Sequence, residues 1–206
     1  MSRECAQGLI FGGVFFISDT EEEDPMQATE ELKHEHAIIL KVLDAAAIEV
    51  LRISQTYKIN PGKTAAMLDF FKGFVDRCHH TKEELHLFPM MERHGQPREI
   101  GPLAVMFEEH TLGRIYLKTA AKALSLVDKG DQSSIDEVGG NLGAYIDLLR
   151  AHIAKENNIL FPLADSLMTP EDQAGLEKAF AEVEAGIMGP EAHEKYRQLA
   201  NELART

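Results

Sequence analysis

The sequence predicts an all-α protein, an antiparallel up-down-up-down four-helix bundle followed by two shorter C-terminal helices. Three observations predict this fold. Apolar residues recur at spacings of three and four over four long segments, Pro, Gly and Asn punctuate the chain between them, and no segment has the apolar–polar alternation of a strand. Because the intervening loops are short, neighbouring helices are expected to be antiparallel.

Proline and capping residues set the limits of the first two helices. The first periodic segment begins after Pro25 and extends to about Tyr57. Asn60 and Pro61 supply an N-cap and a first-turn residue for the second helix, which should end near His94 because a Gly-Gln-Pro sequence follows.

The remaining helices are placed in the same way. A third helix is expected over about 99–128, and Ser134-x-x-Glu137 is a capping box that opens a fourth helix. The Pro-containing sequences that follow open two shorter helices, over about 169–185 and 189–203.

We divide the chain into an N-terminal extension (1–25), the bundle (26–165) and a C-terminal helical hairpin packed on the bundle (166–206). The extension contains a short apolar run, residues 9–17, followed by an acidic linker. This run is shorter than the roughly 20 residues that span a bilayer, and no small-residue cleavage site of a signal peptide follows it. We therefore expect the run to pack on the body of the protein or on a partner.

Composition and charge exclude several classes of partner. The 206 residues are 44% hydrophobic, enough to bury a substantial core. The formal net charge of −13 disfavours nucleic acid and anionic membranes, because both are themselves negatively charged. The two cysteines, Cys5 and Cys78, form no C-x-x-C motif, which favours a reducing, cytoplasmic location.

One long motif occurs twice. The pattern H-x-x-K-E-x-x-x-L-F-P covers residues 79–89 and, 73 residues later, residues 152–162. A Glu-His dipeptide is also repeated, at residues 35–36 and 109–110. Each half thus has one His followed by a His-x-x-x-Glu pair, whose helical spacing places both side chains on one face, as in the metal centres of helix bundles.

Helix lengths bring six of these residues to one level of the bundle. Each lies about 18–22 residues from the turn at the far end of its helix, or roughly 30 Å at the rise of an α-helix. The six also fall on the apolar stripes of their helices. The predicted metal ligands are His36, His79, Glu83, His110, His152 and Glu156.

The second helix offers two pairs with the same spacing, His79 with Glu83 and His80 with Glu84. The residues four, eight and eleven positions before His79 are apolar, whereas the row before His80 contains Arg, Asp and Lys. Glu83 also matches Glu156, since each stands five residues before the Phe of a Leu-Phe-Pro sequence. We therefore favour His79 and Glu83. The other histidines are interpreted as surface residues or as neighbours of the site, with His86 at its rim: His34, His80, His86, His94 and His193.

A metal-free interpretation is the alternative. A single His or Glu in a helix is usually solvated or paired with a neighbour. Burying four imidazoles and two carboxylates in one layer without a cation would cost several kcal/mol per unpaired charge, a cost that a metal ion removes. Mutual His–Glu pairing in a helical interaction module would avoid part of this cost.

With these motifs, residues 28 to about 165 resemble the hemerythrin-like family, also called HHE cation-binding domains. The resemblance implies a four-helix bundle that holds two non-haem irons joined by an oxo or hydroxo bridge, with Glu83 and Glu156 as bridging carboxylates. Zinc or manganese would suit the same donors. The terminal ligands implied by the resemblance are His36, His79, His110 and His152.

The chain differs from the oxygen carriers of that family at two positions. Arg114 stands where carriers look to have a further His, and Asn157 where they look to have an Asp. The missing imidazole opens a coordination position or calls for another donor, such as Tyr145, and this disfavours simple reversible O₂ carriage. Around the site we therefore expect Tyr145, Arg114 and His86.

Two classes of function follow. In the first, a di-iron module binds O₂, peroxide or nitric oxide for sensing, redox chemistry or stress defence, and the C-terminal helices contact a redox or protein partner. In the second, an oxidoreductase turns over peroxide or nitric oxide with the help of Arg114 or Tyr145. Iron handling is a third interpretation, which predicts readily exchangeable metal.

Overall fold

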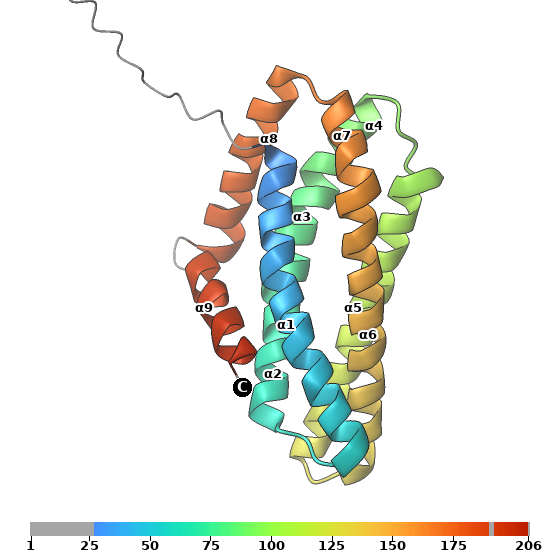
Figure 1. The fold of residues 1–206 in the computed structure, drawn as a ribbon, viewed down its shortest axis with the longest axis vertical. Helices are drawn as coiled ribbons and strands as arrows, with labels where there is room; N and C mark the ends of the chain where they lie inside the picture. The colour runs from blue at the N-terminus through green and yellow to red at the C-terminus, as the bar shows by residue number, and fades with distance from the viewer. Residues whose placement is uncertain (1–26, 190–191, 206) are drawn as a thin grey trace, which may run out of the picture.

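The computed structural model describes residues 27–189 and 192–205, and within these ranges it contains helices and no strand. Four long helical runs lie side by side, each antiparallel to the run before it (Figure 1). The all-α bundle with additional C-terminal helices is therefore confirmed. The N-terminal extension, with its apolar run, lies outside the described residues.

Two of the four runs are single α-helices and two are composite. The single helices are α1 (Ala28–Thr56) and α5 (Gly101–Asp128). The second run consists of α2 (Pro61–Phe70), η1 (Phe71–His79), α3 (His80–Lys82), η2 (Glu83–Leu87) and α4 (Phe88–Arg93). The fourth consists of the 3-10 turn η3 (Gln132–Ser134), α6 (Ile135–Lys155), η4 (Glu156–Leu160) and α7 (Phe161–Leu167). The segments η1, η2 and η4 are π-helical.

Proline explains two of these π-helical segments. Pro89 follows η2 and Pro162 follows η4, and a proline inside an α-helix donates no hydrogen bond and clashes with the carbonyl four residues earlier. In both segments the N–H of the Phe before the proline bonds instead to the carbonyl five residues earlier, that of Glu83 or Glu156. The wider turn lets each helical run continue through its Leu-Phe-Pro sequence.

The segment η1 changes which residues of the second run face inward. The N–H of His80 bonds to the carbonyl of Val75, five residues earlier. Val75 is completely buried, and His80 follows it into the interior with only 4% of its surface exposed, while His79 stays buried as well. The surface position expected for His80 is therefore wrong, because the π-helical turn replaces the α-helical spacing on which that expectation depends.

The helix caps agree with the sequence at two positions and differ at a third. The side chain of Asn60 caps α2, and Thr169 forms a capping box with Asp172 at the start of α8. The capping box expected at Ser134 is absent. Instead, the Ser134 hydroxyl donates to Asp131, and the 3-10 turn η3 leads into α6.

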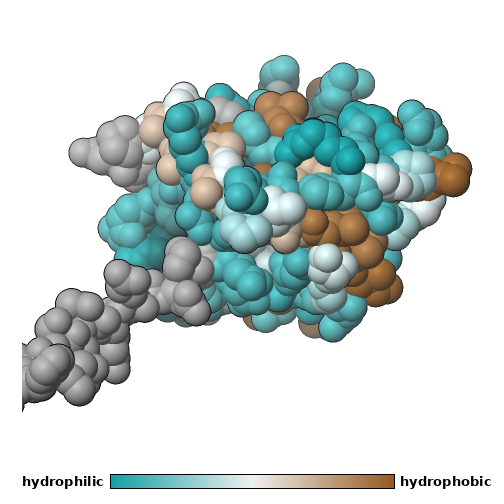
Figure 2. Space-filling model, turned by 90° about the horizontal axis from the view of Figure 1, so that it is seen from above, coloured by the Kyte–Doolittle hydropathy of each residue, from teal (hydrophilic) through white to brown (hydrophobic). Residues whose placement is uncertain are grey.

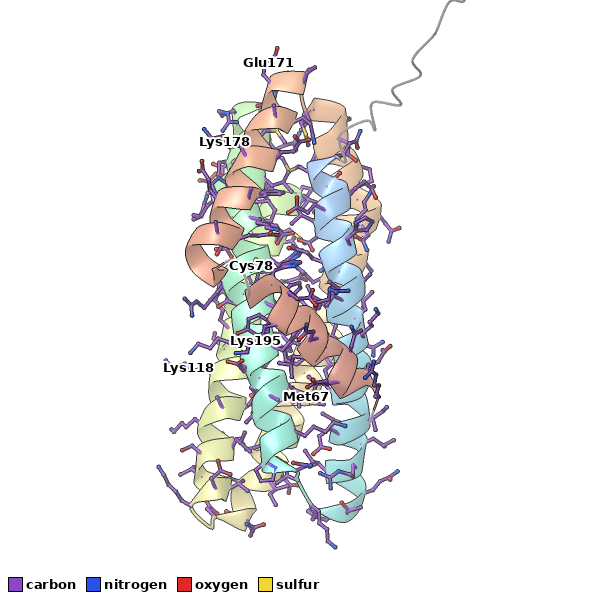
Figure 3. All side chains as sticks on the ribbon, turned by 90° about the vertical axis from the view of Figure 1, so that its left-hand side faces the viewer. Met67, Cys78, Lys118, Glu171, Lys178 and Lys195 are labelled. Atoms are coloured by element: carbon purple, nitrogen blue, oxygen red, sulfur yellow. The ribbon has the colours of Figure 1, made fainter. Side chains whose placement is uncertain are left out.

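The C-terminal helices lie across one side of the bundle. They comprise α8 (Pro170–Val183), η5 (Glu184–Met188) and α9 (Ala192–Ala204). Figure 3 faces this side and shows α9 crossing α2 obliquely. A Cβ atom on Gly73 of η1 would lie 1.9 Å from the hydroxyl oxygen of Tyr196, so the glycine allows α9 to approach the bundle closely.

The core is divided into two apolar clusters. One surrounds Ile39, Phe71 and Leu142, and the other surrounds Leu32, Phe88 and Phe161. A layer of buried His and Glu side chains separates them. The end of the molecule seen in Figure 2 has a mainly hydrophilic surface with apolar residues gathered on one side. Among the described helices, none combines the length and the hydropathy needed to cross a membrane.

Candidate metal centre

Seven side chains meet in the buried layer, each at most 4% exposed. They comprise the six residues predicted from the repeated motifs and, in addition, His80. Their nitrogen and oxygen atoms form two sets, each within 4.8 Å, that share Glu83. The two-histidine set is His36, His79, Glu83 and Glu156, and the three-histidine set is His80, Glu83, His110 and His152.

The two carboxylates lie between the sets. Oε1 of Glu83 is 3.4 Å from Nε2 of His79, and Oε2 of Glu83 is 3.5 Å from Nε2 of His110. The Glu156 oxygens are 3.2 and 3.1 Å from Nε2 of one histidine in each set, His36 and His152 respectively. Each carboxylate therefore directs one oxygen toward each set, which is the arrangement required to bridge two metal ions.

Several inner polar atoms lack hydrogen-bond partners, although Nε2 of His36 lies 2.9 Å from Nε2 of His79 and Nε2 of His110 lies 3.0 Å from Nε2 of His152. All four carboxylate oxygens of Glu83 and Glu156, and both ring nitrogens of His80, are buried without a hydrogen-bond partner among the described residues. An unpaired buried polar atom costs free energy, and an unpaired buried charge costs more. As ligands of cations the four carboxylate oxygens and one ring nitrogen of His80 would be satisfied, so the side chains that are present fit a metal centre; Nδ1 of His80 lies 3.7 Å from an oxygen of Asp76.

Burial shifts the protonation of this layer toward metal-binding forms. It lowers the pKa of His79 to about 4 and that of His80 well below its ordinary value, so these rings are neutral and have a free lone pair. Burial and the neighbouring charge of Glu156 raise the pKa of Glu83. Against the effect of burial, Glu156 raises the pKa of His152 to about 9, so these two side chains form an ion pair when no metal is bound.

The outer nitrogen of four histidines is held by a side-chain oxygen. A ring whose Nδ1–H donates outward presents the lone pair of Nε2 inward, so these hydrogen bonds select the metal-binding tautomer. The Nδ1–oxygen pairs are His36–Asn157 at 2.8 Å, His79–Glu35 at 2.7 Å, His110–Glu84 at 2.6 Å and His152–Glu109 at 2.9 Å.

The Glu and Lys of the repeated motifs form one relay in each half. Glu35, from the first Glu-His dipeptide, bonds to His79 and also accepts from Lys82 at 2.7 Å. The corresponding relay in the second half consists of Glu109, His152 and Lys155. The Lys of the motif therefore neutralises the carboxylate that orients the metal-facing histidine.

The Phe of each Leu-Phe-Pro sequence covers a histidine from the other half. Phe161 stacks on His36 with ring centroids 5.4 Å apart, and Phe88 stacks on His110 at 6.0 Å. Both phenylalanines are completely buried. They cover the faces of the imidazoles with apolar surface and exclude water from the layer.

His80 breaks the symmetry between the halves. Its ring stacks on His110 at a centroid distance of 3.8 Å, and the position 73 residues later is Ile153. The fourth run is α-helical up to Lys155, so it has no π-helical turn before its motif histidine. The doubled His-His at residues 79–80 is the only feature of the sequence that signals this additional histidine.

Arg114 lies beside the three-histidine set. Its guanidinium donates to Asp76 at 2.6 Å and to Glu84 at 2.8 Å, and the same Glu84 oxygen accepts from Nδ1 of His110. Arg114 is therefore connected to His110 through Glu84.

Of the other two residues expected around the site, one is buried in the bundle and the other faces the C-terminal helices. Tyr145 is buried beside Phe71, with ring centroids 4.9 Å apart, and its hydroxyl has no hydrogen-bond partner in the described part of the chain. His86 belongs to neither set. Its ring lies 6.5 Å from that of Phe180 on α8, so it contacts the C-terminal helices.

Residues 27–164 match the family model described as the hemerythrin HHE cation binding domain. The chain belongs to this family. It is also 23% identical over 164 residues to uncharacterized protein Mb2018 of Mycobacterium bovis and to uncharacterized protein Rv1995 of Mycobacterium tuberculosis. These alignments cover 80% of this chain and 64% of each relative, so the chain spans less than two thirds of their length. No solved structure matches the chain significantly. The buried His and Glu side chains of this HHE domain have the positions and chemistry to hold a metal ion.

Proposed function

We propose that this HHE domain binds two iron ions in its buried layer, one at each set of histidines, with Glu83 and Glu156 bridging them. The observation that carries the proposal is the position of the four carboxylate oxygens, which divide equally between the sets and have no hydrogen-bond partner among the described residues. Imidazole together with carboxylate suits iron, and zinc or manganese is the alternative.

The two ions have unequal numbers of protein donors. The two-histidine set supplies His36, His79 and both carboxylates, whereas the three-histidine set supplies one more imidazole, that of His80. With one shared solvent-derived ligand, an ion at the three-histidine set would have six donors, and an ion at the two-histidine set would have five and one position left for a ligand. His80 would thus provide the additional donor for which Tyr145 was a candidate, and a small ligand would bind at the two-histidine end.

The function that this arrangement supports best is the binding of a small diatomic or peroxide ligand, such as O₂, nitric oxide or H₂O₂, for sensing, redox chemistry or stress defence. Iron supplies the affinity for such ligands and the capacity for electron transfer. The chain supplies fixed imidazole tautomers, through Glu35 and its counterparts, and a dry cavity, through Phe88 and Phe161.

Metal content tests the ligand assignment. We expect about two irons per native chain and about one in His79→Ala, because this variant leaves the two-histidine set with only three protein donors. His34→Ala is the matched control, since His34 is exposed on α1, and it should retain the native content. Plasma mass spectrometry identifies the bound metal and measures the number of ions per chain. Native protein without metal, or a His79→Ala variant with full content, would overturn the assignment.

Ligand stoichiometry tests the function. Nitric oxide added to the reduced, iron-loaded protein should saturate at about one molecule per pair of irons, because one coordination position is free. Absorption spectroscopy follows this titration. No binding by the loaded protein, or two equivalent binding events per pair, would contradict the proposal. Consumption of peroxide far beyond the iron content would identify an oxidoreductase instead of a binding or sensing module.

A further inference from the structure

The C-terminal helices reach the metal centre through one buried ammonium group, that of Lys82. Its side chain is completely buried, and Nζ donates to Glu31 at 2.5 Å, to Glu35 at 2.7 Å and to Glu184 at 2.7 Å. Glu31 and Glu35 belong to α1, whereas Glu184 is the first residue of η5. Because Lys82 precedes the bridging Glu83, residues of the C-terminal segment contact a direct neighbour of the metal ligands.

Glu35 connects this ammonium group to His79. One oxygen of Glu35 accepts from Lys82, and the other accepts from Nδ1 of His79. Nε2 of His193, on α9, lies 3.8 Å from an oxygen of Glu35 and 3.8 Å from an oxygen of Glu184. Glu35, Glu184 and His193 also have the spacing of a small metal site. Lys82 already provides the cation of this cluster, so we assign it no metal.

The second half of the bundle contains the same relay, but its lysine makes no ion pair with the C-terminal helices in the described part of the chain. Lys155 pairs with Glu109, which holds His152, and Lys155 is 35% exposed where Lys82 is fully buried. Lys155 has no other ion pair in the described part of the chain. The C-terminal helices therefore act on the relay of His79 and leave the relay of His152 exposed.

We propose that Glu184 is a positioning residue for the two-histidine metal site. Glu184 fixes Lys82, which in turn fixes the carboxylate of Glu35 against His79. The inference rests on the proposed function, because it assumes that His79 binds metal. Partners that orient a ligating histidine typically contribute a factor of about 10–100 to metal affinity. Glu184 does not contact His79 but reaches it through Lys82 and Glu35. Its removal should therefore lower metal affinity by a smaller factor, and at one of the two ions only.

Iron release to the chelator 2,2′-bipyridine measures this effect on the full-length, iron-loaded protein. In Glu184→Gln, about half of the iron should leave roughly five- to tenfold faster than in the native protein, and the rest at the native rate. Glu182→Gln is the matched control, because it removes the same charge from α8 at an exposed position that pairs only weakly with Lys178. Glu184→Asp should restore part of the native behaviour.

The second half provides the mirror experiment. Glu109→Gln should accelerate release of the other half of the iron, because Glu109 holds His152. Equal acceleration of all the iron in Glu184→Gln would indicate general loosening of the fold and would overturn the inference, as would unchanged release. Either result leaves the proposed function intact if the native protein contains iron. Native protein without iron would overturn both.

Discussion

Replacing Glu156 by Ala is expected to remove metal from both sites at once. Its two carboxylate oxygens lie 3.2 Å from His36 and 3.1 Å from His152, so a single substitution takes one donor and part of the negative charge from each ion. We expect metal content to fall from about two ions per chain to well below one. Plasma mass spectrometry measures the content, and circular dichroism confirms that the variant is folded.

The control for this prediction is Glu137→Ala. Glu137 lies on the same helix, α6, but is exposed, so the variant should retain both metal ions. A Glu156→Ala protein that lost only one ion would show that Glu156 serves one set of histidines, and the bridging assignment would be wrong.

Removing the metal is expected to destabilise the protein strongly. Without cations, the carboxylate of Glu83 and the ring nitrogens of His80 remain buried without a hydrogen-bond partner among the described residues, and the charge of Glu156 is offset by His152. We expect the free energy of unfolding to fall by at least about 4 kcal/mol. For a chain of this length, that corresponds to a decrease in Tm of roughly 10 °C. Thermal unfolding followed by circular dichroism, with and without chelation, measures the change.

Two controls accompany the chelation experiment. Adding iron back should restore the native Tm, which shows that the chelator does not act on the fold directly. The chelator should leave the Tm of Glu156→Ala nearly unchanged, because that variant has little metal to lose. If chelation removed the metal from the native protein and its Tm stayed the same, the metal would contribute nothing to folding and the buried layer would be stable without it.

The repeated motifs made much of the centre predictable from the sequence. Both halves carry the same residues at the same distances from their turns. Helical periodicity and short loops were therefore sufficient to place His36, His79, His110 and His152 at one level and on inward faces. The i, i+4 spacing likewise placed Glu83 beside His79, and its counterpart in the second half beside His152.

His80 could not be predicted because its position depends on a π-helical turn. Pro89 and Pro162 give a physical reason for the π-helical turns beside them, but no proline follows η1 at the corresponding position. α-Helical spacing therefore assigned His80 to the polar face. The π-helical turn contains one residue more than an α-helical turn, so both His79 and His80 face the interior.

The connection between Glu184 and Lys82 was also beyond the sequence. These residues are 102 positions apart, and the C-terminal segment carries no motif that relates it to the bundle. Their contact depends on how α8 and η5 dock against the first two helical runs, which is a property of tertiary packing. The Lys of each motif was visible as part of the repeat, but its pairing with Glu35 or Glu109 required the structure.

The central claim is that two metal ions lie in the buried layer between Glu83 and Glu156. Anomalous diffraction at the iron absorption edge, on crystals of the iron-loaded protein, tests it most directly. We expect two peaks, one beside His36 and His79 and the other beside His80, His110 and His152. A single peak, or a well-ordered layer without any peak in which these histidines bond to the carboxylates, would contradict the claim.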